Sequence, residues 1–247
     1  MCSSGVAMAA IPTLPLENAT MTRNTARRRS PREAPGLLCQ MLSRRLRTSA
    51  KIASVVRDPY DTAAYDAALR EVTVGPVAPL SAPIEVRDYD PAWPEAYARE
   101  AARIGAALGN RALRLEHVGS TSVPGLPAKP IIDIVLEVAD SAEEAAYVPD
   151  LEAAGYALRI REASWFEHRL LRDPAGRVHL HVFSAGCPET ERMVRFRDHL
   201  RADGADRDRY AATKRDLAAR EWKYMQQYAD AKTAIVQEIM ARATAPR

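Results

Sequence analysis

Hydrophobic and polar positions alternate along parts of this chain in a way that predicts a β-sheet. Residues 131–138 are almost all apolar and rich in β-branched side chains, which is typical of a buried strand. At 178–182 apolar and polar residues alternate strictly, so one face of that strand is apolar and the other is polar. The predicted strands are a short one at Val86 and longer ones at 111–118, 131–138, 156–160, 167–172 and 177–184.

Apolar residues at helical spacing predict the remaining elements. One helix is expected to begin near 91–94 and to end near Leu108, and another to run from Ser141, as its N-cap, to Ala154. Strands that alternate with helices in this order predict an α/β (α+β) domain. Three long C-terminal helices, expected to pack on the sheet and on each other, are predicted at 189–202, 206–220 and 223–243.

The N-terminal third differs from the rest of the chain. Frequent prolines and a basic composition rich in Ser, Thr and Asn predict that residues 1–80 form a disordered or weakly structured extension before a domain at 84–243. Weak helical patterns occur at 37–56 and 61–72. The arginines at 27–29 fit a contact with nucleic acid or a membrane surface, a targeting peptide, a solvated tail, or a gene start assigned too far upstream.

Charge and composition exclude some function classes. The 247-residue chain has a formal net charge of +3, but the basic excess lies in its first 84 residues, so the domain carries no strong nucleic-acid signal. No apolar run approaches the roughly 18 residues that a membrane span needs, and no membrane contact is expected. The three cysteines form no close pair, which favours the reducing cytoplasm.

A turn between two of the predicted strands carries the first candidate site. Gly119 has no Cβ, so its backbone could approach a ligand closely. Asp133 stands alone in the apolar strand that follows, where a buried carboxylate needs a partner. Hydroxyl and N–H groups suited to a phosphate come from Ser120, Thr121 and Ser122.

His179 and His181 share the polar face of their predicted strand. If that strand neighbours the one with Asp133, the imidazoles could bind a metal with it, act as a base, or contact a phosphate. Alternatively, both histidines hydrogen-bond Asp133 or loop carbonyls and only close a polar pocket. Lys129, just before the strand, is either a phosphate contact or part of a solvated turn.

These motifs resemble the signature of the GrpB family (UPF0157 type), small bacterial proteins assigned to the nucleotidyltransferase superfamily. The resemblance extends from 84–94 through the Gly119 turn, 179–183 and 196–201 to the Tyr-x-x-x-Lys patterns near the C-terminus, about two thirds of the chain. It implies a nucleotidyltransferase-like mixed sheet with flanking helices and C-terminal helices. It also implies that basic residues on the C-terminal helices bind phosphate. These residues are Arg197, Arg201, Lys214 and Lys232, and each of the two lysines ends a Tyr-x-x-x-Lys pattern.

The sequence departs from the superfamily at its acidic residues. Members of the superfamily place two acids two positions apart on one strand and a third on a neighbouring strand, whereas Val135 stands two positions after Asp133 here. Glu137 lies on the same face but about 13 Å away along an extended strand, while paired catalytic ions lie about 4 Å apart. An ordinary two-metal mechanism is therefore not expected.

These observations lead to one leading hypothesis and two alternatives. The leading hypothesis is a nucleotidyltransferase-like protein that binds a nucleotide or another phosphorylated small molecule and could transfer a nucleotidyl group. Asp133 and His181 would be catalytic, and a divalent ion, Mg²⁺ or a transition metal, would lie at Asp133, His179 and His181. The alternatives are a non-catalytic ligand-binding or regulatory module and a single-metal phosphoesterase that uses the same three residues.

Overall fold

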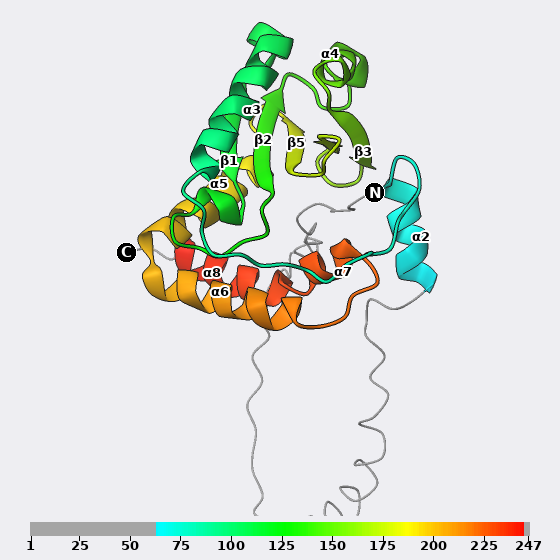
Figure 1. Ribbon diagram of the computed structural model, residues 1–247. Helices are drawn as coiled ribbons and strands as arrows, with labels where there is room; N and C mark the ends of the chain where they lie inside the picture. Colours follow the sequence, from blue (N-terminus) through cyan, green and yellow to red (C-terminus); the bar gives the residue numbers. More distant parts are fainter. Residues whose placement is uncertain (1–62, 245–247) are drawn as a thin grey trace, which may run out of the picture. The chain divides into compact units, whose positions relative to one another are not determined.

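A five-stranded sheet forms the centre of residues 63–244, the part of the chain that the computed structural model describes (Figure 1). The strand order is β1-β2-β5-β4-β3; β2 and β5 are parallel, and all other neighbours are antiparallel. The predicted α/β fold with a mixed sheet is thus confirmed. The strands are β1 (Arg114–Val118), β2 (Ile132–Val138), β3 (Ala157–Glu162), β4 (His168–Arg172) and β5 (Val178–Ser184).

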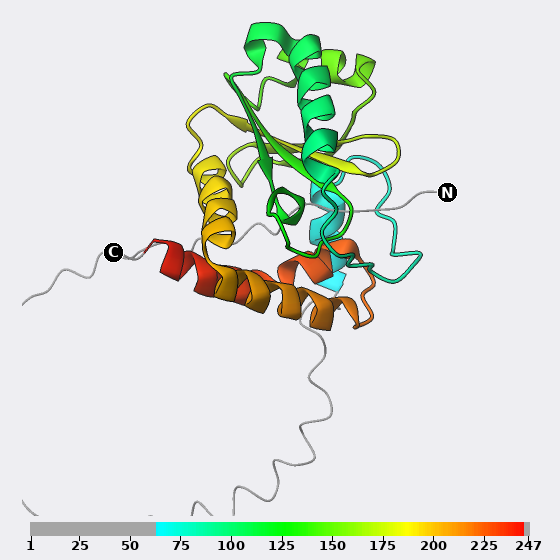
Figure 2. The ribbon, with the colours of Figure 1, turned by 60° about the vertical axis from the view of Figure 1, so that its left-hand side comes forward.

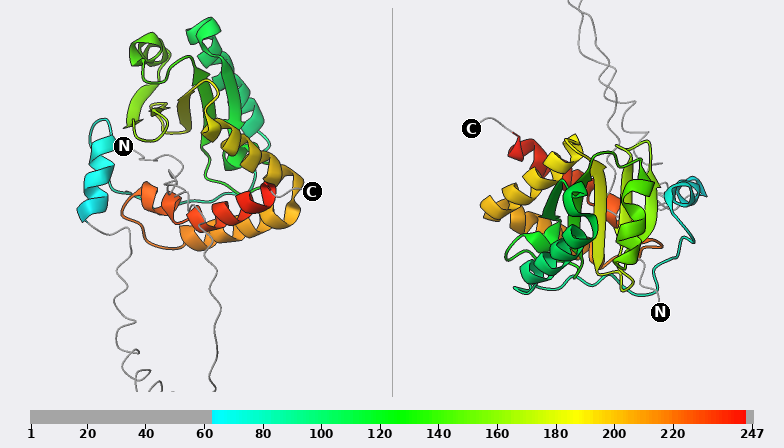
Figure 3. Two further views of the ribbon diagram at one scale, coloured as in Figure 1. Left: turned by 180° about the vertical axis from the view of Figure 1, so that it is seen from behind. Right: turned by 90° about the horizontal axis from the view of Figure 1, so that it is seen from above.

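One face of the sheet is covered by α3 (Trp93–Leu108) and α4 (Val148–Ala153), as the view from above shows (Figure 3). The even-numbered residues of β2, such as Ile134 and Leu136, pack with Ile104 of α3 in the largest apolar cluster. Because side chains alternate along a strand, Asp133 and Val135 point to the opposite face. The candidate site therefore belongs to the face that α3 and α4 do not cover.

Four C-terminal helices pack on that opposite face and across one end of the sheet. Figure 2 shows α5 running from the end of β5 down to α6, with α7 and α8 beside α6. The loop between β1 and β2 packs into the cluster that α5, α6 and α8 share, through Val123 and Leu126. The helices are α5 (Pro188–Ala202), α6 (Gly204–Ala218), α7 (Met225–Asp230) and α8 (Thr233–Ala243), and none of the helices described between 63 and 244 is long and apolar enough to cross a membrane.

The N-terminal boundary of the folded region requires a correction. Residues 63–80 were predicted to belong to a disordered or weakly structured extension, but α2 (Ala63–Val72) is a helix, as the pattern at 61–72 indicated. Thr73 forms a bridge with Ile160 of β3, and the Tyr65 hydroxyl donates to Asp230 of α7 at 2.5 Å. The predictions for 27–29 and 37–56 lie outside the described residues.

The prediction of a single helix from Ser141 to Ala154 is wrong. A short 3₁₀ helix, η4 (Glu144–Ala146), precedes α4, because Pro149 cannot donate a backbone hydrogen bond and is accommodated only in the first turn of a new helix. Ser141 is not an N-cap: its backbone N–H and its hydroxyl both contact the Ser184 hydroxyl, at 3.0 and 3.1 Å.

Two further elements differ from the prediction. The strand expected at Val86 is only an isolated bridge between Arg87 and Ala128. The helix expected over 223–243 is divided into α7 and α8, because the Lys232 N–H donates three residues back, to Ala229, at 3.2 Å. That tighter turn ends α7 and makes Lys232 the residue that precedes α8.

Candidate functional site

The turn after β1 brings Gly119 against Asp133. Val118 pairs with Asp133 in the neighbouring strand, and η3 (Ser120–Ser122) begins directly after Gly119. Gly119 has φ +67, and a Cβ built on it would lie 2.9 Å from Cβ and Cγ of Asp133 and still closer to the carboxylate. Gly119, which was expected to approach a ligand, is not part of the cavity wall, and it leaves room for the Asp133 side chain.

Ser122 and Arg201 hold this turn in place. The Ser122 hydroxyl donates to the Gly119 carbonyl at 2.6 Å, and the Arg201 guanidinium donates twice to the Ser122 carbonyl, at 3.0 and 2.8 Å. The side chains of Ser122 and Arg201, which were expected to bind phosphate, are both engaged in the turn, and neither lines the cavity.

His117 and Thr121 also stabilise this turn. His117 stacks on Tyr97 with 4.7 Å between ring centroids, and its Nε2 lies 3.1 Å from the Thr121 hydroxyl, which donates to the Ile131 carbonyl at 3.0 Å. Burial lowers the pKa of His117 to about 4, so the ring is neutral at pH 7. Thr121 lines the cavity, but its hydroxyl is already paired.

The predicted proximity of Asp133, His179 and His181 is present in the structure. The parallel pairing of β2 with β5 puts Asp133 opposite His179 and Val135 opposite His181. Asp133 Oδ1 lies 3.3 Å from His179 Nδ1 and 3.9 Å from His181 Nε2. An ion bound at about 2.1 Å in tetrahedral geometry separates its ligands by about 3.4 Å, so this cluster could hold one metal ion.

The Asp133 carboxylate is ionised and the neighbouring His179 is neutral. Burial opposes ionisation of Asp133, but hydrogen bonding to His179 and the proximity of His181 outweigh it and hold the pKa of Asp133 well below its ordinary value. Burial lowers the pKa of His179 to about 4 despite Asp133. His181 lies beneath Asp133, 1% exposed, and does not line the cavity.

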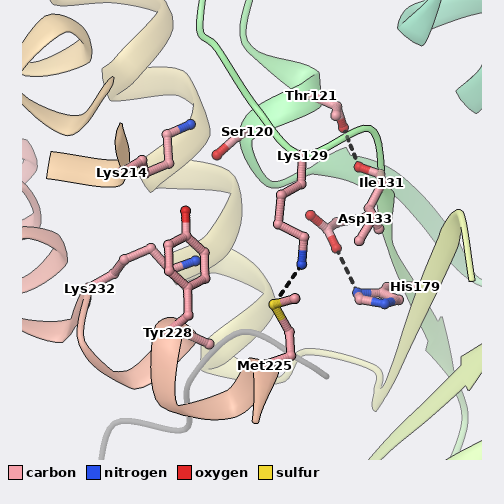
Figure 4. Close-up of a pocket in the computed structure, with 11 residues that line it drawn as sticks. Ser120, Thr121, Lys129, Ile131, Asp133, His179, Lys214, Met225, Tyr228 and Lys232 are labelled. Atoms are coloured by element: carbon pink, nitrogen blue, oxygen red, sulfur yellow. Dashed lines mark hydrogen bonds and ion pairs between the residues drawn. The ribbon is translucent and has the colours of Figure 1, made fainter. Parts of the chain in front are cut away.

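A cavity of about 70 Å³ opens above Asp133 and His179, between the β1–β2 loop and the C-terminal helices (Figure 4). It is walled by residues of the loop, of β2 and β5, and of α6, α7 and the start of α8. The lining residues are Ser120, Thr121, Lys129, Ile131, Asp133, His179, Lys214, Met225, Tyr228, Ala229 and Lys232.

Three lysines from separate elements reach this cavity. Lys129 precedes β2 with its Nζ 2.8 Å from Met225 Sδ, and Lys214 of α6 donates to the Pro127 carbonyl. Burial, reinforced by Lys232, lowers the pKa of Lys129 to about 7 and holds the pKa of Lys214 well below its usual range. Burial also lowers the pKa of Lys232. Asp133 is the single carboxylate among the described lining residues.

The two Tyr-x-x-x-Lys patterns have the same local geometry. Lys214 Nζ lies 4.9 Å from the ring centroid of Tyr210, and Lys232 Nζ lies 4.7 Å from that of Tyr228, because residues four apart share one face of a helical turn. Tyr210 is buried within hydrogen-bonding reach of Ser120, and burial raises its pKa. Both patterns thus direct an amine toward the cavity, as the resemblance implied.

Arg197 does not line the cavity. Its guanidinium donates to Glu116 at 2.7 Å, to the His117 carbonyl at 2.9 Å and to Asp198 at 2.8 Å, so it joins α5 to β1 away from the cavity. Arg197 and Lys214 were expected to act alike, and helix packing places only Lys214 at the cavity.

Several residues near the site were not predicted from the sequence. Met225 and Tyr228 close the cavity from α7, and Tyr228 is the tyrosine of the Tyr-x-x-x-Lys pattern that ends at Lys232. His168 of β4 contacts His181, and the strand pairing that follows the turn at 173–176 could have placed the two histidines on one face.

Comparison with known proteins gives matches along most of the described region. Residues 83–242 match the family model described as GrpB protein. A UPF0157 protein of Halalkalibacterium halodurans is 61% identical over 180 residues, which cover 73% of this chain and 92% of that protein. The crystal structure of conserved protein GrpB from Enterococcus faecalis is similar with a TM-score of 0.56 and 32% identity, covering 64% of this chain and 96% of that chain.

A further relative is part of a larger protein. Dephospho-CoA kinase of Mycolicibacterium paratuberculosis is 32% identical over 166 residues, which cover 56% of this chain and 40% of the kinase.

Proposed function

This chain belongs to the GrpB family, whose fold is nucleotidyltransferase-like, and on that basis we propose that its cavity binds the phosphoryl group of a small phosphorylated molecule, such as a nucleotide. One observation carries the proposal: three lysines and one carboxylate line the same small cavity among the described residues. Buried amines repel one another and lose hydration, so an anionic ligand would relieve a cost that the ligand-free protein bears.

The size of the cavity supports a phosphoryl group as the part that enters it. About 70 Å³ holds a few heavy atoms, whereas sites for drug-sized ligands are typically about 300–1,000 Å³. The Ser120 hydroxyl faces the same space and would donate to a phosphate oxygen (Figure 4). The nucleoside or other organic part would therefore lie outside this cavity.

An adjoining groove offers room for that organic part. It measures about 280 Å³ and shares Lys129, Ile131 and Met225 with the cavity, so the two adjoin along these side chains. Its other walls are the segments 80–85 and 175–177. A ligand with its phosphate near Lys214 would extend past Lys129 into this groove.

The chemistry of the site supports at most one metal ion. Asp133, His179 and His181 would hold it, and the ion would neutralise charge on a phosphate oxygen. Val135 packs against Phe183 in an apolar cluster, so no second carboxylate stands beside Asp133 in the described part of the chain. Nucleotidyl transfer by this protein would therefore proceed without the usual pair of metal ions. We place this function in the cytoplasm, where nucleotides are abundant.

Titration of the purified protein with inorganic phosphate, pyrophosphate, ATP and dephospho-CoA tests the proposal. Lys214→Met is expected to weaken binding at least tenfold, because a charge-assisted hydrogen bond contributes about 1.5–3 kcal/mol. The stability of the ligand-free variant is measured alongside, because the substitution removes a buried amine and also the hydrogen bond to the Pro127 carbonyl. Lys223→Met is the matched control: Lys223 also lies over a tyrosine, Tyr224, at 4.9 Å, but outside the cavity.

Turnover assays on the same proteins distinguish the three functions considered for this site. Metal-dependent consumption of ATP that is lost in Asp133→Ala would identify a transferase. Release of phosphate from simple esters would identify a phosphoesterase, and binding without turnover a regulatory module. If none of the four anions binds more tightly to wild type than to Lys214→Met, the proposal is wrong.

A further inference from the structure

A chain of hydrogen bonds leads from the Asp133 cluster to the end of β3. His181 Nδ1 lies 3.1 Å from His168 Nε2, and His168 Nδ1 lies 2.7 Å from Glu162 Oε2. His181 Nε2 is buried and has no hydrogen-bond partner, since Asp133 Oδ1 is 3.9 Å away. His179 Nε2 is likewise buried without a partner. The contacts among Glu162, His168 and His181 involve β3, β4 and β5, and none of these three residues lines the cavity.

The direction of these hydrogen bonds follows from the groups at their ends. The Glu162 carboxylate only accepts, so His168 Nδ1 carries the hydrogen and donates to it. His168 is fully buried, which favours the neutral ring, and its Nε2 is then an acceptor. His181 Nδ1 must in turn donate to His168. In the neutral His181 ring, the remaining nitrogen, Nε2, therefore presents a lone pair toward Asp133 Oδ1.

Packing fixes this arrangement. The His168 ring stacks on Phe183 with 4.8 Å between centroids and lies edge-on to Trp165 at 4.9 Å. It also stacks on His181 at 5.2 Å. A lone pair facing a carboxylate oxygen in a buried site is unfavourable in isolation, and a cation between the two atoms would satisfy both.

We propose that Glu162 and His168 are positioning residues that hold His181 with Nε2 available to a metal, so that Asp133, His179 and His181 bind a first-row transition-metal ion such as Zn²⁺ in preference to Mg²⁺. Imidazole nitrogens suit Zn²⁺ and its neighbours, whereas Mg²⁺ prefers oxygen ligands in octahedral geometry. The inference rests on the proposed function only in placing the ion beside the bound phosphoryl group. It departs from the carboxylate-bound ions that the resemblance to the nucleotidyltransferase superfamily implies.

A second cluster of His and Asp does not compete for this ion. His199, Asp203 and Asp206 also lie near one another. Both Asp206 oxygens, however, accept hydrogen bonds from Arg242, at 2.8 and 2.6 Å, and one also contacts His199 Nε2 at 2.7 Å. An arginine cation already occupies the place where a metal would be needed.

The test measures the affinities of metal-stripped, full-length protein for Zn²⁺ and for Mg²⁺. They are determined by competition with a chromogenic chelator, at fixed pH and without phosphate. Wild type should bind one Zn²⁺ far more tightly than Mg²⁺. His168→Phe keeps the ring stacking but removes both hydrogen bonds, and it should weaken Zn²⁺ binding about 10–100-fold. Glu162→Gln, which still offers an acceptor to His168, should weaken it less than Glu162→Leu.

Two measurements keep the result interpretable. Circular dichroism shows whether each variant is folded, and Co²⁺ absorption reports nitrogen ligation that His181→Gln should alter and His199→Gln should not. Unchanged Zn²⁺ affinity in folded His168→Phe or in both Glu162 variants, loss of binding in His199→Gln, or no preference for Zn²⁺ over Mg²⁺ would overturn the inference. Phosphate binding is measured separately through Lys214→Met, so either proposal can fail alone.

Discussion

The backbone of Gly119 lies directly against the carboxylate of Asp133, and no side chain fits between them. The two residues are brought together because Val118 pairs with Asp133 across β1 and β2. The combination φ +67, ψ −173 at Gly119 is almost restricted to glycine. The glycine of the Gly-Ser turn is thus required for the position of Asp133, and the serine is the residue that faces the cavity.

Gly119→Ala is expected to destabilise the protein by about 2–4 kcal/mol, because backbone strain of about 1–3 kcal/mol adds to the displacement of Asp133. Equilibrium urea denaturation measures the change. Gly105→Ala is the control: Gly105 lies within α3 and an added Cβ meets nothing within 4 Å, so this variant should gain about 0.5–1 kcal/mol. A Gly119→Ala protein as stable as wild type would contradict the close packing described here.

The sequence predicts the sheet and the centre of the site because both depend on local patterns. Strict alternation placed His179 and His181 on one face, and a lone acid in an apolar strand marked Asp133. The positions of Arg197 and Lys214 could not be predicted in this way. Each lies on a polar helix with little hydrophobic periodicity, so the rotation of that helix against the sheet depends on contacts between residues far apart in sequence.

Anion binding should weaken as the pH rises above 7. Burial lowers the pKa of Lys129 to about 7, so in the ligand-free protein this amine loses its proton above that pH, and an anion must then bind together with a proton. Lys214 and Lys232, whose pKa values are also lowered, add to the effect, while ionised Asp133 opposes it. Sulfate is the suitable probe because its own charge is constant, and its affinity should fall at least about tenfold from pH 7 to pH 9.

Lys129→Met should make this pH dependence shallower, because one of the titrating amines is removed. Isothermal titration calorimetry in two buffers also counts the protons taken up with sulfate. Wild type should take up about one proton or more at pH 8, and Lys129→Met fewer. An affinity that is constant from pH 7 to pH 9 would show that the amines stay charged in the free protein.

Arg197→Met is expected to lower stability without changing anion binding. The substitution leaves Glu116 and the His117 carbonyl without the hydrogen bonds that now join α5 to β1, and the loss should be about 2 kcal/mol. Arg195→Met, on an exposed part of the same helix, should change stability by less than about 0.5 kcal/mol. A loss of sulfate affinity beyond twofold in folded Arg197→Met would restore the original assignment of this residue as a ligand.

Asp206 is expected to make stability depend on pH in the acid range. Its carboxylate joins three helices through Arg242 of α8 and His199 of α5, and the hydrogen bond from Arg242, with a smaller contribution from His199, lowers its pKa to about 2. Because the folded-state pKa lies below the unfolded value of 3.8, the stabilisation is complete above about pH 4 and is lost as the pH falls toward 2.

Asp206→Asn should therefore cost about 2 kcal/mol at pH 7, measured by urea denaturation, and the difference from wild type should shrink between pH 4 and pH 2. Asp208→Asn, on the exposed side of α6, should show no such convergence, and a constant difference between wild type and Asp206→Asn down to pH 2 would mean that packing, not charge, holds the three helices together.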